Sequence, residues 1–295
     1  MFRTYQAVFW ALAIVSACTI QVGAAADLPN VTIERNLPYV AHGHERQKLD
    51  LYLPTQEAGA VPLPVLVWIH GGAWQEGSKD NPPALPLLSD GYALASINYR
   101  LSQHAVFPAQ IEDCKAAIRW LRANAKKYHL DPDHIGVFGA SAGGHLAALL
   151  GTTAGVKALE GTLGNADQSS QVQCVVDWFG PTDLAALAGA DEDVKSPIAK
   201  LLGGPAIKHP ELAKQGSPLT YVGRHVAPIM ITHGTKDSIV PIAQSADFAA
   251  ALKKAGADVT YTVVEGGGHG FTPQKTAELA LPLRAFLAKY LKPPK

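Results

Sequence analysis

The sequence predicts an α/β fold, in which a mostly parallel sheet is covered by helices on both faces. Short apolar runs alternate along the chain with longer helical segments, which is the pattern of such folds. Residues 65–69 are continuously apolar, as expected for a strand buried on both sides. The 295 residues are 47% hydrophobic and contain no linker, charge block or internal repeat, which predicts one domain over 27–295.

In the first half of the chain, residues 48–53 alternate apolar with polar side chains and predict a half-buried strand. Residues 92–99 predict another strand. A long amphipathic helix is expected over 108–128, because Pro108 suits a first helical turn and the apolar stripe that follows, Cys114 included, has helical spacing.

The second half continues the same alternation. A turn at 131–133 should precede a short buried strand at 135–138 and an Ala/Leu-rich helix at 142–150. We further expect strands at 172–179, 229–232 and 259–264, and helices at 241–255 and 272–291, the last interrupted or restarted at Pro282. In such sheets the ligand site lies at the carboxyl ends of the strands.

The stretch 183–226 is too long for a simple connection. It mixes short helical pieces with turn residues, so we expect either a small cap over the site or an excursion on the surface.

The first 26 residues predict a secretory signal peptide, with Arg3, an apolar run at 7–17 and small residues at 24–26. The run is too short to span a membrane stably, so the protein should be exported, periplasmic or secreted. An alternative is a lipoprotein anchored at Cys18. Export would permit a disulfide between Cys114 and Cys174, although two separately buried thiols are favoured.

Balanced charge, with 25 basic and 25 acidic residues, gives no indication of a nucleic-acid partner, and the sequence leaves the oligomeric state open. Gly139-Ala140-Ser141-Ala142-Gly143 reads G-x-S-x-G between a predicted strand and a predicted helix. A serine on that tight turn projects its hydroxyl above the sheet edge, where an acyl-transfer nucleophile is needed.

A serine hydroxyl needs a base, and the base needs an acid that fixes its tautomer. His269 lies on a glycine-rich loop after the last predicted strand, and Asp237 lies just past the strand before it. The order Ser141, Asp237, His269 is that of an α/β-hydrolase. Asp183 is the rival acid; the other histidines near the motifs, His145 and His233, are expected to be structural.

His70-Gly71-Gly72-Ala73-Trp74 directly follows the apolar strand at 65–69. Glycines there let backbone N–H groups converge on one point, so we expect an oxyanion hole formed by the N–H groups of Gly72, Ala73 and Ala142. His70 is expected to brace this loop.

Together these motifs resemble those of α/β-hydrolase carboxylesterases of the hormone-sensitive-lipase-like kind, and most of all the bacterial acetylxylan/feruloyl esterase group. Asn98-Tyr99-Arg100-Leu101, Phe107-Pro108-Ala109-Gln110 and Gly180-Pro181-Thr182-Asp183-Leu184 support the closer match. Many relatives carry a third glycine at the position of Ala73, but alanine keeps the N–H group.

The resemblance implies a secreted serine esterase that needs no metal or cofactor and acts on a small ester or an acylated plant polysaccharide. Trp74, Trp178 and Phe271 flank predicted strand ends and are candidates for substrate contacts, with core packing as the alternative. Two other functions are considered, an arylformamidase-like hydrolase and a non-catalytic binding protein of the same fold. The presence of all the expected catalytic residues disfavours the non-catalytic protein.

Overall fold

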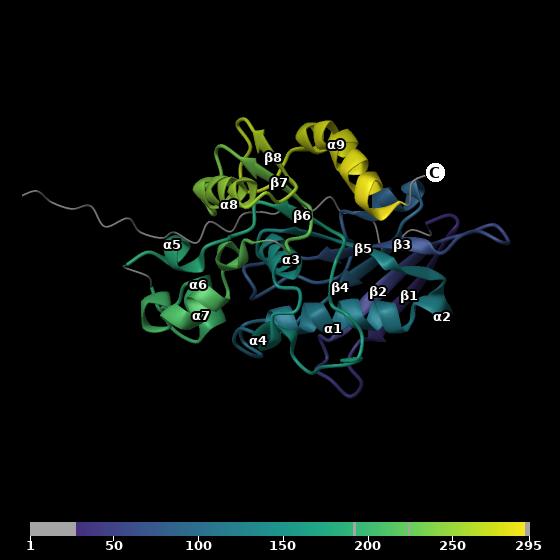
Figure 1. Cartoon of the computed structure of the whole chain (residues 1–295), viewed down its shortest axis with the longest axis horizontal. Coiled ribbons are helices and arrows are strands. Elements are labelled where there is room, and N and C mark those ends of the chain that lie inside the picture. Colours follow the sequence, from purple (N-terminus) through teal and green to yellow (C-terminus); the bar gives the residue numbers. More distant parts are fainter. Residues whose placement is uncertain (1–27, 191–192, 224, 293–295) are drawn as a thin grey trace, which may run out of the picture.

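The structure is a computed structural model that describes residues 28–190, 193–223 and 225–292. Within them the strands are β1 (Val31–Pro38), β2 (Lys48–Pro54), β3 (Leu63–Ile69), β4 (Ala93–Ile97), β5 (Leu130–Ala140), β6 (Cys174–Trp178), β7 (Ile229–Gly234) and β8 (Val259–Val264). They form one eight-stranded sheet in the order β1-β2-β4-β3-β5-β6-β7-β8 (Figure 1). The β1–β2 and β2–β4 pairs are antiparallel and the other pairs are parallel, which confirms the predicted fold class.

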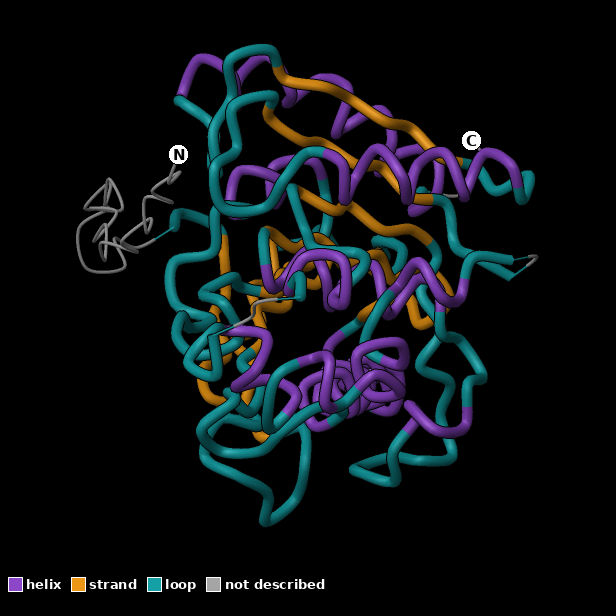
Figure 2. Tube along the Cα trace, turned by 90° about the vertical axis from the view of Figure 1, so that its left-hand side faces the viewer, coloured by secondary structure: helices purple, strands orange, loops and turns teal. Residues whose placement is uncertain are grey.

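Helices cover both faces of the sheet, with strands running through the molecule between them (Figure 2). The principal helices are α1 (Ala109–Ala123), α2 (Ala125–Tyr128), α3 (Ala142–Thr152), α4 (Lys157–Glu160), α8 (Ala243–Lys254), α9 (Pro273–Leu291) and the 3₁₀ helix η1 (Leu85–Asp90). Buried side chains of α1, α3 and α8 form the larger core on one face, whereas α9 and η1 cover the other.

Two strands differ from the sequence prediction. The edge strand β1 was not predicted, because most of its side chains are exposed and it carries little apolar pattern. The prediction of a half-buried β2 is wrong, since Asp50 points into a covered face and is completely buried. The Lys79 ammonium, 2.8 Å away, and the Arg35 guanidinium, 3.3 Å away, compensate its charge.

Three local details also differ from expectation. The turn at 131–133 exists as a bulge inside β5, where the Asp133 N–H donates to Asp131 Oδ1 over 2.9 Å. The predicted long helix breaks at Asn124 into α1 and α2. Helix α9 continues through Pro282 as one helix, so the predicted interruption is wrong.

Residues 183–226 lie between β6 and β7 and contain five short helical pieces in their described part. These are α5 (Leu184–Ala188), α6 (Pro197–Leu202), η2 (Ala206–Lys208), α7 (Pro210–Gln215) and η3 (Pro218–Tyr221). The Phe107 N–H donates to Leu201 O over 2.8 Å, and Lys200 Nζ donates to Gln75 Oε1 over 2.7 Å. The insertion therefore packs beside the loops that follow β3 and β4.

Cys114 and Cys174 are both buried free thiols, as favoured by the sequence. The predicted signal peptide at 1–26 and the alternative anchor Cys18 lie outside the described residues. None of the helices in the described part of the chain is long and apolar enough to cross a membrane.

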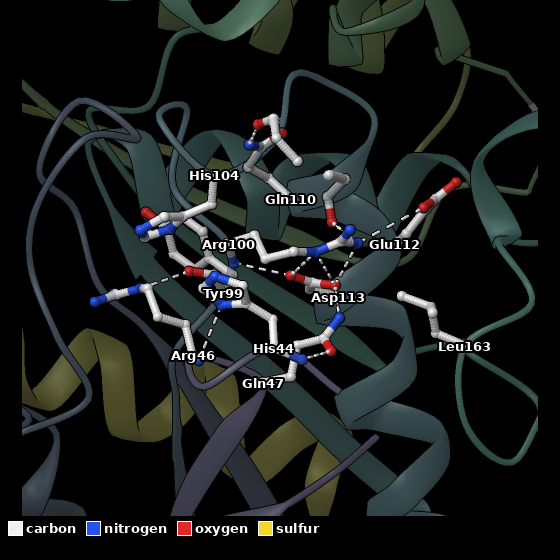
Figure 3. Close-up of polar contacts among 12 residues, drawn as sticks. His44, Arg46, Gln47, Tyr99, Arg100, His104, Gln110, Glu112, Asp113 and Leu163 are labelled. Carbon is white, nitrogen blue, oxygen red and sulfur yellow. Dashed lines mark hydrogen bonds and ion pairs between the residues drawn. The ribbon is translucent and has the colours of Figure 1, made fainter. Parts of the chain in front are cut away.

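A buried carboxylate ties the N-terminal loops to α1 (Figure 3). Asp113 is completely buried and accepts hydrogen bonds from the backbone N–H of Arg100 over 2.8 Å and from its guanidinium over 2.7 Å. Gln47 Nε2 donates to the same carboxylate over 2.7 Å. Four donor atoms surround one charge, so the segment before β2 and the segment after β4 share a single anchor on α1.

Replacing Asp113 should lower the free energy of unfolding more than an ordinary surface mutation does. Asp113→Ala leaves the Arg100 guanidinium and the Gln47 amide without their shared acceptor, and we expect a loss of about 3 kcal/mol of unfolding free energy. Urea unfolding followed by circular dichroism measures it, with exposed Asp167→Ala as the control. Equal stability of the two variants would contradict the assigned role of Asp113.

Candidate active site

Ser141 occupies a strained turn at the carboxyl end of β5. Its φ of 56° lies in the left-handed region, which is uncommon for a residue with a side chain. The turn is held on both sides, because the Ser141 N–H donates to Trp178 O over 2.9 Å and the Ser141 carbonyl accepts from the His145 N–H over 3.0 Å. Helix α3 begins at the next residue, so the serine stands at the junction predicted from the sequence.

Gly143 allows α3 to approach the end of β3 directly. A Cβ atom at this position would lie 2.0 Å from the carbonyl oxygen of Ile69 and 2.7 Å from that of His70. No side chain fits there, because both contacts are with backbone atoms that cannot move aside. The glycine of the motif thus brings the serine turn against the loop that follows β3.

The three residues predicted to act together are in contact. His269 Nε2 lies 2.8 Å from Ser141 Oγ, and His269 Nδ1 lies 2.8 Å from Asp237 Oδ2. The carboxylate only accepts, so Nδ1 carries the imidazole proton and Nε2 is free to accept the proton of the serine hydroxyl. The arrangement is that of a nucleophile, a base and an orienting acid.

The Asp237 carboxylate has further donors. Its Oδ1 accepts the N–H groups of Ile239 and Val240, each over 2.9 Å, and its Oδ2 lies 3.2 Å from His233 Nε2. Burial acts to raise the pKa of Asp237, but the hydrogen bonds from His233, His269 and the two backbone groups outweigh it and hold the pKa well below its usual range. The carboxylate is therefore ionised at neutral pH.

The second histidine on this carboxylate was expected to be merely structural. His233 is the penultimate residue of β7 and is fully buried, with Nε2 also 2.9 Å from Val240 O and Nδ1 2.7 Å from Ser245 Oγ. Both neighbours of Nε2 are acceptors, so Nε2 carries the proton and donates to Asp237 as well. Its position four residues before Asp237, at a strand end, was the available signal.

The rival residues from the sequence lie elsewhere. Asp183 caps helix α5, where its Oδ1 accepts the Ala186 N–H over 3.0 Å. His145 is fully buried in α3, where Nδ1 accepts from Trp74 Nε1 over 3.2 Å and Nε2 donates to Gly216 O over 2.6 Å. Burial lowers the pKa of His145 to about 4, so this neutral ring links the loop after β3 to the insertion.

The residues predicted to form the oxyanion hole also lie at this edge. Gly72 and Ala73 have φ values of 104° and 51° in the loop after β3, and Ala142 is the first residue of α3. None of their three N–H groups donates a hydrogen bond to another part of the chain that the structure describes. These groups are available to a ligand oxygen.

The candidate aromatic contacts divide into two groups. Trp74 is only 3% exposed and packs in the core, with its indole N–H donated to His145. Trp178 and Phe271 are partly exposed and meet edge to face at 5.3 Å. Phe179, which has a strained φ of 46°, packs 5.2 Å from the Phe271 ring and 4.8 Å from that of His269. The buried Phe179 ring thus lies between His269 and Phe271, and of these aromatic residues Trp178 and Phe271 keep exposed surface.

Among the described residues, no cluster of three or more His, Cys, Asp or Glu side chains is arranged to hold a metal ion.

A mostly parallel sheet with a strained serine turn and a Ser-His-Asp contact at its carboxyl edge is the arrangement of the α/β-hydrolase fold. The proteins to which the chain is similar include several named esterases. The chain belongs to the BD-FAE family, whose family model matches residues 49–252.

Three relatives illustrate the likeness. Esterase LipQ of Mycobacterium tuberculosis is 37% identical over 80% of this chain and 56% of its own length. A structure described as a truncated form of carbohydrate esterase from gut microbiota is 38% identical, with a TM-score of 0.79 over 88% of this chain and 95% of that one. A bifunctional GH43-CE protein of Bacteroides eggerthii is 37% identical, with a TM-score of 0.79 over 87% of this chain and 35% of that one.

The chain spans about half the length of the curated relatives that it matches.

His145→Gln should reduce stability in a manner that depends on pH. At pH 7.5 we expect a loss of roughly 2 kcal/mol, because buried groups of Trp74 and Gly216 lose a partner. The pKa of His145 in the folded protein, about 4, lies below its unfolded value near 6.5, so the unfolded state binds the extra proton between these values. The wild type therefore loses this stabilisation as pH falls from 6.5 to 4.

The measurement is the melting temperature of both proteins from pH 7.5 to 4.5, followed by circular dichroism. The gap between wild type and His145→Gln should narrow as pH falls, whereas exposed His225→Gln should track the wild type throughout. A gap that stays constant over the whole range would show that the buried imidazole is not held neutral.

Proposed function

We propose that this protein is an exported serine carboxylesterase that hydrolyses short-chain acyl or hydroxycinnamoyl esters, including those of plant polysaccharide. Ser141 is the nucleophile, His269 the general base and then acid, and Asp237 the orienting acid. The observation that carries the proposal is the continuous contact from Asp237 Oδ2 through both nitrogens of His269 to Ser141 Oγ, with 2.8 Å at each step.

The reaction has two halves. Ser141 Oγ attacks the ester carbonyl carbon while its proton moves to His269 Nε2, and the resulting imidazolium faces the ionised Asp237. Cleavage of the ester C–O bond releases the alcohol with that proton and leaves an acyl group on Ser141. Water then attacks the acyl carbon, gives its proton to His269, and the released serine recovers it as the carboxylic acid leaves.

The oxyanion of each tetrahedral intermediate binds to the N–H groups of Gly72, Ala73 and Ala142. Support comes from their lack of acceptors within the described chain and from the close approach at Gly143, which brings α3 to the loop after β3. The N-terminus of α3 adds a favourable partial positive charge at the same point.

The substrate class rests on two lines of support. One similar structure is described as a carbohydrate esterase. The partly exposed rings of Trp178 and Phe271 suit an aromatic acyl group or a sugar ring, by stacking or edge contact, and the buried Phe179 connects Phe271 to His269.

The position of the site suits an ester carried on a larger molecule. The His269 side chain keeps 15% of its surface exposed, so the base is reachable from solvent. We propose that the insertion at 183–226 borders the path of the substrate, since it packs beside the loops after β3 and β4. Export, expected from residues 1–26, fits a polymeric ester outside the cytoplasm.

Ser141→Ala should abolish turnover without unfolding the protein. Removing the nucleophile should lower kcat for p-nitrophenyl acetate by more than about 10⁴-fold, as in other serine triads. Circular dichroism checks the fold, and Ser89→Ala, an exposed serine, is the control. Turnover retained in Ser141→Ala would refute the assignment of Ser141 as the nucleophile.

The substrate class is tested on the wild-type protein. Acetylated xylan or methyl ferulate should be hydrolysed faster than N-formylkynurenine, and the reverse order would favour an arylformamidase.

Asp237→Asn tests the acid. The amide cannot stabilise the imidazolium and favours the wrong His269 tautomer, so kcat should fall by up to about 10⁴-fold. Asp183→Asn is the matched comparison and should affect stability more than kcat, because it caps α5. If Asp183→Asn, and not Asp237→Asn, abolishes turnover, the assignment of the acid is wrong.

A further inference from the structure

Arg46 contacts the loop that carries the proposed oxyanion donors. It lies between β1 and β2, outside the stretch 49–252 that the family model matches. Its Nη2 atom lies 3.1 Å from His70 Nε2 and 2.9 Å from Gly77 O, and its Nε donates to Tyr99 O over 2.8 Å. One guanidinium thus holds both ends of the 70–77 loop and the segment after β4.

These contacts settle the tautomer of His70. A guanidinium only donates, so His70 Nε2 accepts and Nδ1 carries the proton. Nδ1 then donates to Gly71 O over 2.7 Å. The ring is further held by stacking on Tyr99, with centroids 4.4 Å apart and planes inclined by 15°. Burial lowers the pKa of His70 to about 4, and the nearby Arg46 charge lowers it too, so the ring is neutral at ordinary pH.

The carbonyl of Gly71 belongs to the peptide unit whose N–H is that of Gly72. A trans peptide is planar, with its C=O and N–H pointing in opposite directions. A hydrogen bond that draws Gly71 O toward His70 therefore turns the Gly72 N–H away from His70. The same bond polarises the peptide unit and strengthens the N–H as a donor.

We propose that Arg46 is a positioning residue for the oxyanion hole, acting through His70 to orient the peptide unit of Gly71 and Gly72. This inference rests on the proposed function, because it assigns a task to the Gly72 N–H. Arg46 does not touch the substrate. It fixes which His70 nitrogen donates, and so the direction in which one oxyanion donor points.

The surroundings of Arg46 keep it in place. The Arg46 N–H donates to His44 Nδ1 over 3.1 Å, and the neighbouring Gln47 is anchored on the buried Asp113 (Figure 3). Figure 3 shows the Arg46 side chain beside Tyr99, with the Asp113 cluster next to it. Contacts thus run from α1 through Asp113 and Gln47 to Arg46, and from there to the loop after β3.

The loop is also shaped to enclose the His70–Gly71 hydrogen bond. Gly77 has a φ of 91°, and a Cβ atom there would lie 2.5 Å from His70 Nδ1 and 2.6 Å from Gly71 O. A side chain would push into the hydrogen bond itself. A residue without a side chain is therefore required beside this bond, and Arg46 holds the carbonyl of the same residue.

The test is a double-mutant cycle on p-nitrophenyl acetate turnover. Arg46→Gln should lower kcat roughly 10- to 100-fold with KM nearly unchanged, because the oxyanion forms only in the transition state. His70→Phe keeps the stacked ring but removes both nitrogens and should lower kcat at least as much. The double variant should be no slower than His70→Phe, since Arg46 acts through that ring.

The control is Arg122→Gln, which removes a guanidinium that also holds backbone carbonyls, those of Pro132 and Ser169, at the far end of α1. It should keep the wild-type kcat. Free guanidinium ion added to Arg46→Ala should restore part of the lost rate, and should leave Arg122→Gln unchanged.

Two outcomes would overturn the inference: a wild-type kcat in Arg46→Gln, or losses that multiply in the double variant. If Arg46→Gln does not fold, the test uses Arg46→Lys. A single ammonium nitrogen cannot occupy both the Nη2 position, which contacts His70 and Gly77, and the Nε position, which contacts Tyr99, so its kcat should fall with KM unchanged. If neither wild type nor Arg122→Gln hydrolyses any ester, the proposed function fails instead.

Discussion

The candidate site depends on the contact between the first turn of α3 and the end of β3. Because β3 and β5 are parallel neighbours, their carboxyl ends lie at the same edge, and Gly143 lets the backbone that follows each strand meet. Four residues at this edge have a strained backbone with φ between 46° and 58°, namely Ala73, Trp74, Ser141 and Phe179. Such conformations persist only where surrounding packing enforces them. Here the packed sheet beneath supplies that enforcement.

Four imidazoles around this edge are each held in one tautomer by partners that do not themselves change protonation. Carboxylate and carbonyl acceptors define the proton position in His269 and His233, a backbone carbonyl defines it in His145, and a guanidinium defines it in His70. Only His269 has its second nitrogen directed at a hydroxyl that stands at the sheet edge. In the proposed reaction proton transfer would therefore involve His269 alone, while the other three rings connect neighbouring parts of the fold.

The sequence was sufficient for residues whose position follows from strand order. Ser141, Asp237 and His269 each come just after a strand, and parallel strands deliver their carboxyl ends to one edge. It was insufficient where long-range pairing decides. The burial of Asp50 depends on an ion pair with Lys79, which lies far along the chain, and no local sequence pattern predicts such a pair. Strand β1 was missed because its apolar alternation, at Val31 and Ile33, is short and most of its side chains are exposed.

Arg46 and β1 both precede residue 49, where the match to the family begins. A fragment that begins at residue 49 and runs to the end of the chain would keep Ser141, Asp237 and His269. It would leave β2 as an unpaired sheet edge, a surface that invites association with other chains. A piece of this fold without that open edge must therefore be longer than the stretch 49–252 that the family model matches, and it must begin with β1.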